Sequence, residues 1–130
     1  MNQEDWVSEL SKYDAGWLHI HKSENEGDLQ RASWDDLNYP ARMPTLAAAG
    51  LPFIQYDNSG AVVAVQSLAR ELDIGMFFKD IEQLPGQLLN KAIMAKLRKN
   101  VWLQREKFTF DYHADRLIEF FRQVIRMRHE

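Results

Sequence analysis

The sequence contains no cysteine. This excludes disulfide bridges and thiolate metal sites, and it permits a reducing compartment. No apolar run approaches the roughly 20 residues that a membrane-spanning helix needs, so we expect no transmembrane segment. The N-terminal stretch MNQEDWVSELSKYD is acidic and amphipathic, unlike a signal peptide. These absences predict a soluble, cytoplasmic protein.

Short motifs of nucleotide-binding and nucleophilic sites are also absent. The chain has no G-x-G-x-x-G, no G-x-x-x-x-G-K-[ST] and no G-x-S-x-G. We expect His19 and His21 to point to opposite faces of a strand, and His113 and His129 lie far along the chain. This spacing is unsuited to a shared metal ion. A self-contained catalytic triad and a bound metal are therefore not expected.

The composition is that of a globular protein. The 130 residues are 45% apolar and 27% charged, which suits one domain with its own core, covering residues 1–130. The net charge of −3 gives the whole molecule no attraction for nucleic acid or anionic membrane. Basic residues gather between Lys91 and Lys107, and we interpret them as a solvated helix face rather than a nucleic-acid site.

Hydrophobic spacing predicts alternating helices and strands. Short apolar runs indicate strands over 16–20, 51–57 and 74–78, and helical periodicity covers 3–13, 40–49, 61–72, 84–102 and 112–127. Residues 21–36 form a long polar loop that can hold a short helical turn. Buried strands separated by helices imply crossover connections and a parallel sheet. The predicted fold is α/β, a partial Rossmann-like open parallel sheet of about three strands with flanking helices.

The segment Asn38–Gly60 concentrates three prolines and a run of three alanines. Pro40 and Pro44 are expected in the first turn of a helix, where a missing amide proton costs nothing. The alanines let that helix lie close to the sheet, and Gly50 supplies a left-handed stop. The sequence LPFIQYD then enters the second strand, and DNSG forms a turn.

Ligands of open parallel sheets bind at the carboxyl ends of the strands. Two segments reach that edge here, the helix start near Arg42 and the turn at 57–60. Amides at the helix start and the arginine favour a phosphate ligand, although close packing of the helix on the sheet explains the same residues. The turn at 57–60 could also face a ligand, although an Asx turn with helix capping explains its residues equally. Asp35 and Asp36 form a possible acid–base pair, but we prefer a helix-dipole role for them.

The stretch NYPARMPTLAAAGLPFI resembles the C-terminal, donor-binding domain of GT-B glycosyltransferases, in particular retaining enzymes of the group 1 family. That family has an Asn-x-Pro-x-Lys/Arg start, a short small-residue helix, Gly-x-Pro and an apolar strand. The corresponding residues here are Asn38, Pro40, Arg42, Gly50 and Pro52. The similarity continues to FTFDYHADRLIEFF and covers most of the chain. It implies half of a GT-B C-terminal domain, as a fragment.

The resemblance implies a nucleotide diphosphate sugar as substrate, with no metal or other cofactor, and a saccharide or lipid as acceptor. The donor-binding residues that it implies are Asp36, Asn38, Arg42, Thr45, Asn58, Ser59 and Gly60, and no catalytic residue is assigned. The family often carries two glutamates eight positions apart, which fall at Leu37 and Thr45. Asp36, next to the first position, and the Thr45 hydroxyl would then take over part of those contacts.

The acceptor-binding N-terminal domain of the family has no counterpart in this sequence. We therefore expect the isolated chain to bind a donor without turnover. The last helix would bind that missing domain, or self-associate through residues such as Phe120, Phe121 and Val124. The alternative is a non-enzymatic α/β protein-interaction module that uses exposed sheet or helix faces. Nucleic-acid binding through the basic helix is a third class that we do not favour.

Overall fold

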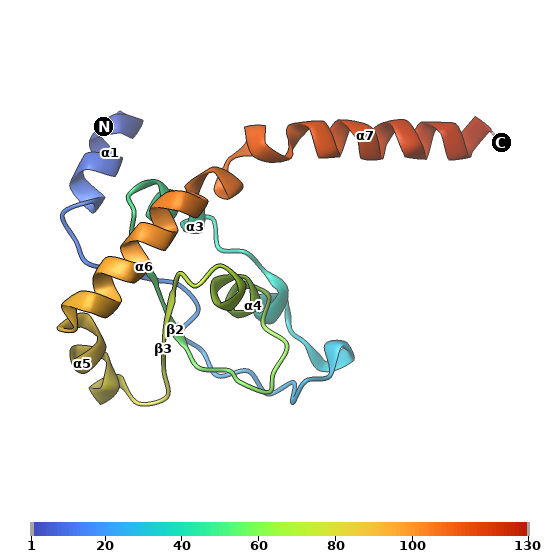
Figure 1. Cartoon of the computed structure of the whole chain (residues 1–130). Coiled ribbons are helices and arrows are strands. Elements are labelled where there is room, and N and C mark those ends of the chain that lie inside the picture. Colours follow the sequence, from blue (N-terminus) through green and yellow to red (C-terminus); the bar gives the residue numbers. More distant parts are fainter. Residues whose placement is uncertain (1, 130) are drawn as a thin grey trace.

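The computed structural model describes residues 2–129 (Figure 1). Its helices are α1 (Gln3–Leu10), α2 (Trp34–Leu37), α3 (Met43–Ala48), α4 (Ala64–Glu71), α5 (Leu84–Leu88), α6 (Lys91–Gln104) and α7 (Phe110–His129). Its strands are β1 (Gly16–Trp17), β2 (Phe53–Tyr56) and β3 (Gly75–Phe78), and short 3-10 turns are η1 (Leu29–Arg31), η2 (Ile81–Gln83) and η3 (Arg105–Phe108).

The three strands form one parallel sheet in the order β1-β2-β3. Strand β1 is short, but its pairing continues beyond Trp17, because Leu18 donates to the Ile54 carbonyl and Tyr56 donates to the His19 carbonyl. The sheet is open and flanked by helices, so the predicted α/β, partial Rossmann-like fold is confirmed.

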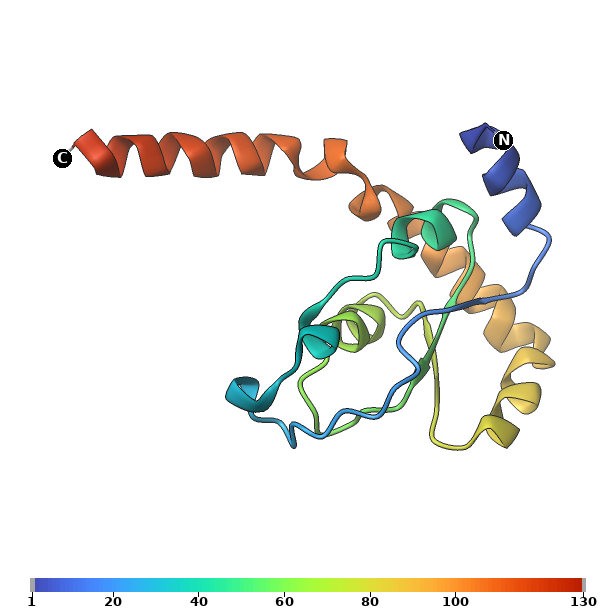
Figure 2. The ribbon, with the colours of Figure 1, turned by 180° about the vertical axis from the view of Figure 1, so that it is seen from behind.

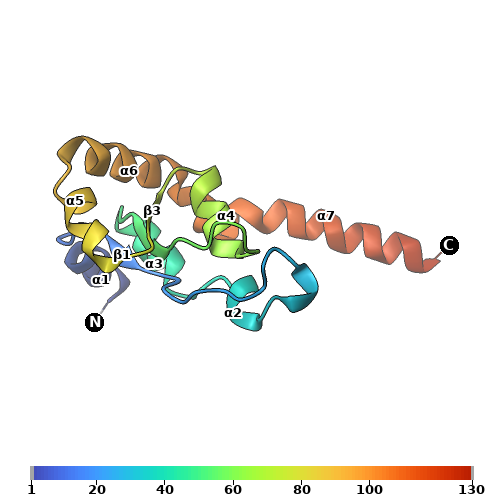
Figure 3. The ribbon, with the colours of Figure 1, turned by 90° about the horizontal axis from the view of Figure 1, so that it is seen from below.

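Each face of the sheet has its own apolar cluster. On one face Leu18 and Phe53 pack with Leu46 of α3 and with residues of α4. On the other face Ile54 and Met76 pack against α5 and α6. Figure 3 shows β3 between α6 and α3. Because both faces of the sheet are buried, its strands are continuous apolar runs.

Helix α3 begins later than predicted. Pro40 to Arg42 form a turn, and the helix starts at Met43, which keeps Pro44 in the first turn. A start at Pro40 would have placed the Pro44 ring deeper in the helix, where it clashes. Gly50 ends the helix with φ of +71°, as expected.

The predicted helix 84–102 is wrong as a single element. The chain breaks between α5 and α6 at Asn90, whose side chain accepts a hydrogen bond from the Ile93 amide at 3.1 Å. The break changes which residues face the core. Met94 and Leu97 are buried, whereas Leu89, just before the break, is 80% exposed.

Helix α7 extends away from the rest of the molecule as a single rod. Figures 1 and 2 place its C-terminal end far from α1 and the sheet. Its main packing partner is the turn η3 at its foot. Although α7 has 20 residues, no described helix combines the length and apolarity needed to cross a membrane.

Candidate functional site

Asn58 joins the two loops at the carboxyl edge of the sheet. Its Oδ1 accepts from the Ser23 amide at 2.7 Å, and its Nδ2 donates to the His21 carbonyl at 2.9 Å. Its own amide donates to Gln66 Oε1 of α4 at 2.7 Å. The Asn58 side chain is buried, so it holds the loop after β1 against the turn after β2.

Asp36 is a buried carboxylate at the same edge, 5% exposed. Its Oδ2 accepts from the amide and hydroxyl of Ser33, at 2.9 and 3.0 Å, and from Asn25 Nδ2 at 3.2 Å. Burial alone would raise the pKa of Asp36, but the hydrogen bonds from Ser33 and Asn25 outweigh it and lower the pKa. Asp36 is therefore an ionised cap of α2, which suits the helix-dipole interpretation better than general-acid chemistry.

Asn25 is the centre of this network, and nothing in the sequence pattern had singled it out. Its Oδ1 accepts from the amides of Gly27 and Val62, at 3.0 and 2.9 Å, and its Nδ2 donates to the Val62 carbonyl at 2.8 Å. Only 1% of the residue is exposed. The Asn-Glu-Gly turn was the one local signal of its role.

Arg42 ties the start of α3 to β1. Its Nε donates to the Trp17 carbonyl and its Nη2 to the Leu18 carbonyl, both at 2.7 Å. A guanidinium carries five N–H donors, so these two bonds leave part of it available. The residue as a whole is exposed. Arg42 thus has a fixed position and free donors, which is a suitable arrangement for an anion contact.

Ser59 and Gly60 form an exposed turn after β2. The Ser59 amide donates to Asp57 Oδ1 at 3.0 Å, and Arg70 of α4 pairs with the same oxygen at 2.8 Å. Partial burial raises the pKa of Asp57, but the Ser59 hydrogen bonds and Arg70 outweigh this effect, so the pKa lies below its ordinary value. Gly60 has φ of +91°. This is the Asx turn of the alternative interpretation.

The remaining two candidates lie elsewhere. The Asn38 amide donates to the Trp34 carbonyl and closes α2. Thr45 lies on α3 and, together with Arg42, lines a hollow of about 620 Å³ against α1. The structure thus places Asp36, Asn58 and the 59–60 turn at the carboxyl edge, Arg42 beside the end of β1, and Thr45 on the side of α1.

A polar hollow of about 500 Å³ opens at the carboxyl edge. It is lined by Lys22, Ser23, Glu24, Asn25, Arg31, Ser33 and Asp36. Its two cations are paired, Lys22 with Glu24 at 3.3 Å and Arg31 with Glu26 at 2.6 Å. The hollow therefore presents hydrogen-bonding groups with little net positive charge.

His19 and His21 lie together, with ring centroids 6.1 Å apart. The expectation of opposite faces was wrong, because residues two apart in an extended segment share a face. His19 is 7% exposed, and neither ring nitrogen has a hydrogen-bond partner within residues 2–129. Burial lowers the pKa of His19 against the opposing influence of Asp36, so the ring is neutral at pH 7.

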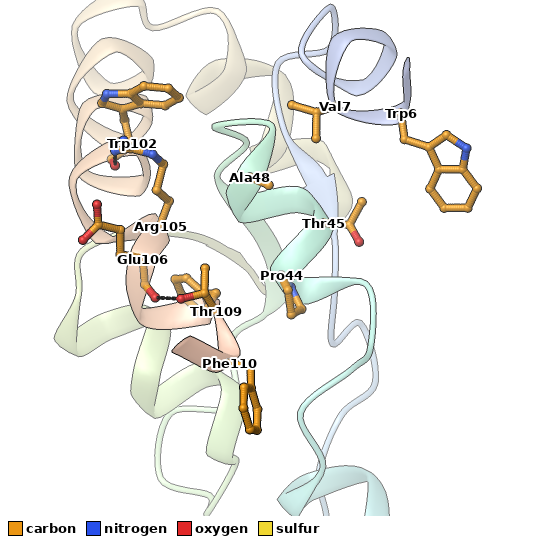
Figure 4. A pocket seen from close by; sticks show the side chains of 11 residues that line it. Trp6, Val7, Pro44, Thr45, Ala48, Trp102, Arg105, Glu106, Thr109 and Phe110 are labelled. Carbon is orange, nitrogen blue, oxygen red and sulfur yellow. Dashed lines mark hydrogen bonds between the residues drawn. The ribbon is translucent and has the colours of Figure 1, made fainter. Parts of the chain in front are cut away.

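A larger, mainly apolar hollow of about 850 Å³ lies between α1, α3 and η3 (Figure 4). Trp6 borders it from α1, and Trp102 borders it from α6, with the Arg105 guanidinium 3.8 Å from the Trp102 ring centroid. Both tryptophans are more than half exposed. Sequence reasoning missed this hollow because its walls come from three distant segments.

The chain matches no protein-family model, no curated protein and no solved structure. What the molecule does is therefore inferred from its residues, its fold and its surface.

Proposed function

We propose that the chain binds the nucleotide diphosphate sugar of a glycosyltransferase, as the C-terminal half of a donor-binding domain. One observation carries the proposal. The segment that resembles the family folds as a small-residue helix followed by β2, which pairs parallel to the preceding β1, and Arg42 is held at the helix start by β1. This is the connectivity that the resemblance requires for a donor-binding edge.

In this proposal Arg42 contacts the diphosphate. Its two bonds to backbone carbonyls fix the guanidinium in advance, and the residue as a whole is exposed. The amide of Gly60, in the exposed turn after β2, adds a further donor. Such preorganised donors stabilise the charge that develops on a leaving diphosphate. Sugar transfer also requires a bound acceptor, for which we assign no site in this chain, so we expect donor binding without turnover.

Titration of uridine diphosphate and guanosine diphosphate against the ¹⁵N-labelled chain tests the proposal. We expect amide shifts concentrated at 38–45 and 57–60, and weaker binding by Arg42→Gln. Arg98→Gln is the matched control, because Arg98 also donates to backbone carbonyls, those of Tyr13 and Ser11, on the amino side of β1. A folded chain that shows no shifts at millimolar nucleotide would contradict donor binding.

The second candidate function is a protein-interaction module, and the exposed helix α7 favours it. Phe120 and Phe121 of α7 are 57% and 54% exposed. An assembly that dissociates when either residue is replaced by Asp, in a chain without nucleotide affinity, would support this function over donor binding.

A further inference from the structure

Strand β1 contains a bulge at Leu18 and His19. In a regular parallel ladder, one residue donates to the neighbouring strand through its amide and accepts from it through its carbonyl. Leu18 donates to the Ile54 carbonyl at 2.9 Å, but the Tyr56 amide donates to the His19 carbonyl at 2.8 Å. Leu18 and His19 therefore both lie opposite Gln55, and two residues against one make a β-bulge.

The bulge makes the Leu18 carbonyl available to Arg42. In a regular ladder this carbonyl would accept from the Tyr56 amide. Instead it accepts from Arg42 Nη2 at 2.7 Å, while the Trp17 carbonyl accepts from Arg42 Nε at 2.7 Å. Successive carbonyls of an extended strand point in opposite directions, so the bulge is what lets one guanidinium reach two of them. The position of Arg42 thus depends on the bulge.

The extra residue also puts His19 on a buried face of the sheet. A shift of one residue turns the side chains that follow to the other face. His19 is 7% exposed, and Gln55, which lies opposite it on β2, is fully buried. Neither side chain has a hydrogen-bond partner in the part of the chain that the structure describes. These two side chains destabilise the bulge, whereas the bonds of Arg42 stabilise it.

A second proton on the His19 ring changes this balance. Burial is the largest influence on the ring and lowers its pKa. The other titratable groups that act on it are Asp36 and Asp35 of α2, which favour the charged ring, and His21, which opposes it. A buried charge without a hydrogen-bonded partner destabilises an arrangement far more than a buried neutral group does. Protonation therefore favours an arrangement that brings the ring to water.

We propose that His19 is a positioning residue for Arg42, and that protonation of its ring converts β1 from the bulge to the regular ladder. The Leu18 carbonyl then accepts from the Tyr56 amide, and the His19 ring leaves the buried face. Arg42 keeps only the exposed bond to the Trp17 carbonyl, so its guanidinium is free to rotate.

The change stays local. The Leu18 amide keeps the Ile54 carbonyl in both arrangements, and Asn58 Nδ2 holds the His21 carbonyl at 2.9 Å. Only the segment between these two anchors has to move. The inference deepens the proposed function and rests on it for its ligand. Arg42 is preorganised for a diphosphate above about pH 6.5, the ordinary pKa of histidine, and loses that preorganisation as the pH falls below it.

Carbon-detected nuclear magnetic resonance of the ¹⁵N,¹³C-labelled chain, without ligand, tests the inference. A fixed guanidinium shows two separate Nη signals, and a rotating one shows a single averaged signal. We expect the two Arg42 signals to merge over the pH range in which the His19 ring titrates, while the Leu18 amide stays protected from exchange. His19→Phe has a ring that gains no proton, so its two Arg42 signals should stay separate from pH 8 to pH 5. His113→Phe, at an exposed position of α7, is the matched control and should behave as the wild type.

Three results would overturn the inference. The Arg42 signals could stay separate while the His19 ring titrates, or they could merge at the same pH in His19→Phe. Protection of the Leu18 amide could also be lost together with the Arg42 signals, which would mean that β1 separates from β2 as a whole.

Uridine diphosphate then measures the consequence at the proposed donor site. We expect the dissociation constant of the wild type, divided by that of His19→Phe, to rise by up to about tenfold for each pH unit below about 6.5. The division removes the effect of protonation of the nucleotide itself. A chain that binds the nucleotide without this pH response contradicts the role of His19 alone. Merging Arg42 signals in a chain that binds no nucleotide contradicts donor binding alone.

Discussion

At the scale of single residues, the most unusual side chain is Gln55 of β2. It is fully buried, and neither atom of its carboxamide has a hydrogen-bond partner in the described part of the chain. An unpaired buried polar group costs about 1–3 kcal/mol. Gln66 of α4 is also buried, but its side chain accepts a hydrogen bond from the Asn58 amide at 2.7 Å. The two glutamines therefore provide a matched pair.

We expect Gln55→Met to raise the free energy of unfolding by about 1 kcal/mol, because it removes the unpaired carboxamide and keeps the volume. Gln66→Met should lower the free energy of unfolding, since it leaves the Asn58 amide without its acceptor. Urea denaturation followed by tryptophan fluorescence measures both. A destabilised Gln55→Met chain would mean that the carboxamide has a partner, such as a buried water.

His19 gives the chain a pH dependence. Burial lowers the pKa of its ring below the ordinary value of 6.5, so the unfolded state binds more protons between the two pKa values. Stability is therefore complete above about pH 6.5 and falls as the pH drops toward the folded pKa. His19→Phe should flatten this part of the curve.

The measurement is the free energy of unfolding from pH 5 to pH 8. The lowered pKa values of Asp36 and Asp57 remove further stability only in stronger acid, below about pH 4. An unchanged slope in His19→Phe would show that another group titrates in this range.

At the scale of elements, the contact between α3 and β1 requires a glycine. A Cβ on Gly16 would lie 2.5 Å from Leu46 Cδ2 of α3. We expect Gly16→Ala to cost about 1–3 kcal/mol of stability through overpacking. Leu46→Ala in the same chain should recover part of that loss, which a double-mutant cycle by urea denaturation measures.

Gly86→Ala is the control for this prediction. Gly86 lies in α5, and nothing lies within 4 Å of where its Cβ would be. Alanine in a helix is favoured over glycine by about 1 kcal/mol, so this variant should be neutral or more stable. Equal losses from both alanines would contradict the role given to Gly16.

The elements also show which parts of the fold the sequence can predict. Each strand is a short apolar run bounded by turn residues, so the local pattern was sufficient for all three. The break between α5 and α6 was missed, because Leu89 and Asn90 carry neither of the strong breaking signals, glycine and proline. Asn90 caps α6 at the point where α5 and α6 separate, and both of these helices pack against the sheet.

The site was less predictable for a related reason. The sequence placed Arg42 and Asn58 near strand ends, but their hydrogen-bond partners lie 24 to 37 residues away. Bonds of such separation depend on tertiary structure and leave no periodic signal. The Asn25 network and the hollow beside Trp102 are of this kind.

At the scale of the whole molecule, body and α7 are distinct parts. Within residues 2–129, neither buried apolar cluster includes a residue of α7. We therefore expect a chain ending at Thr109 to fold with the same core and to remain monomeric at every concentration. Thermal unfolding by tryptophan fluorescence and sedimentation measure these two properties. Loss of a cooperative transition in the shortened chain would show that α7 supports the core.

The separation of α7 from the core affects how unfolding will be observed. All four tryptophans precede α7, at positions 6, 17, 34 and 102, so their emission reports on the body alone. Far-ultraviolet dichroism instead sums the body and the 20 helical residues of α7. Melting curves from the two probes should therefore not coincide. For an intact, correctly folded chain, that mismatch is the expected result and does not indicate a folding intermediate of the body.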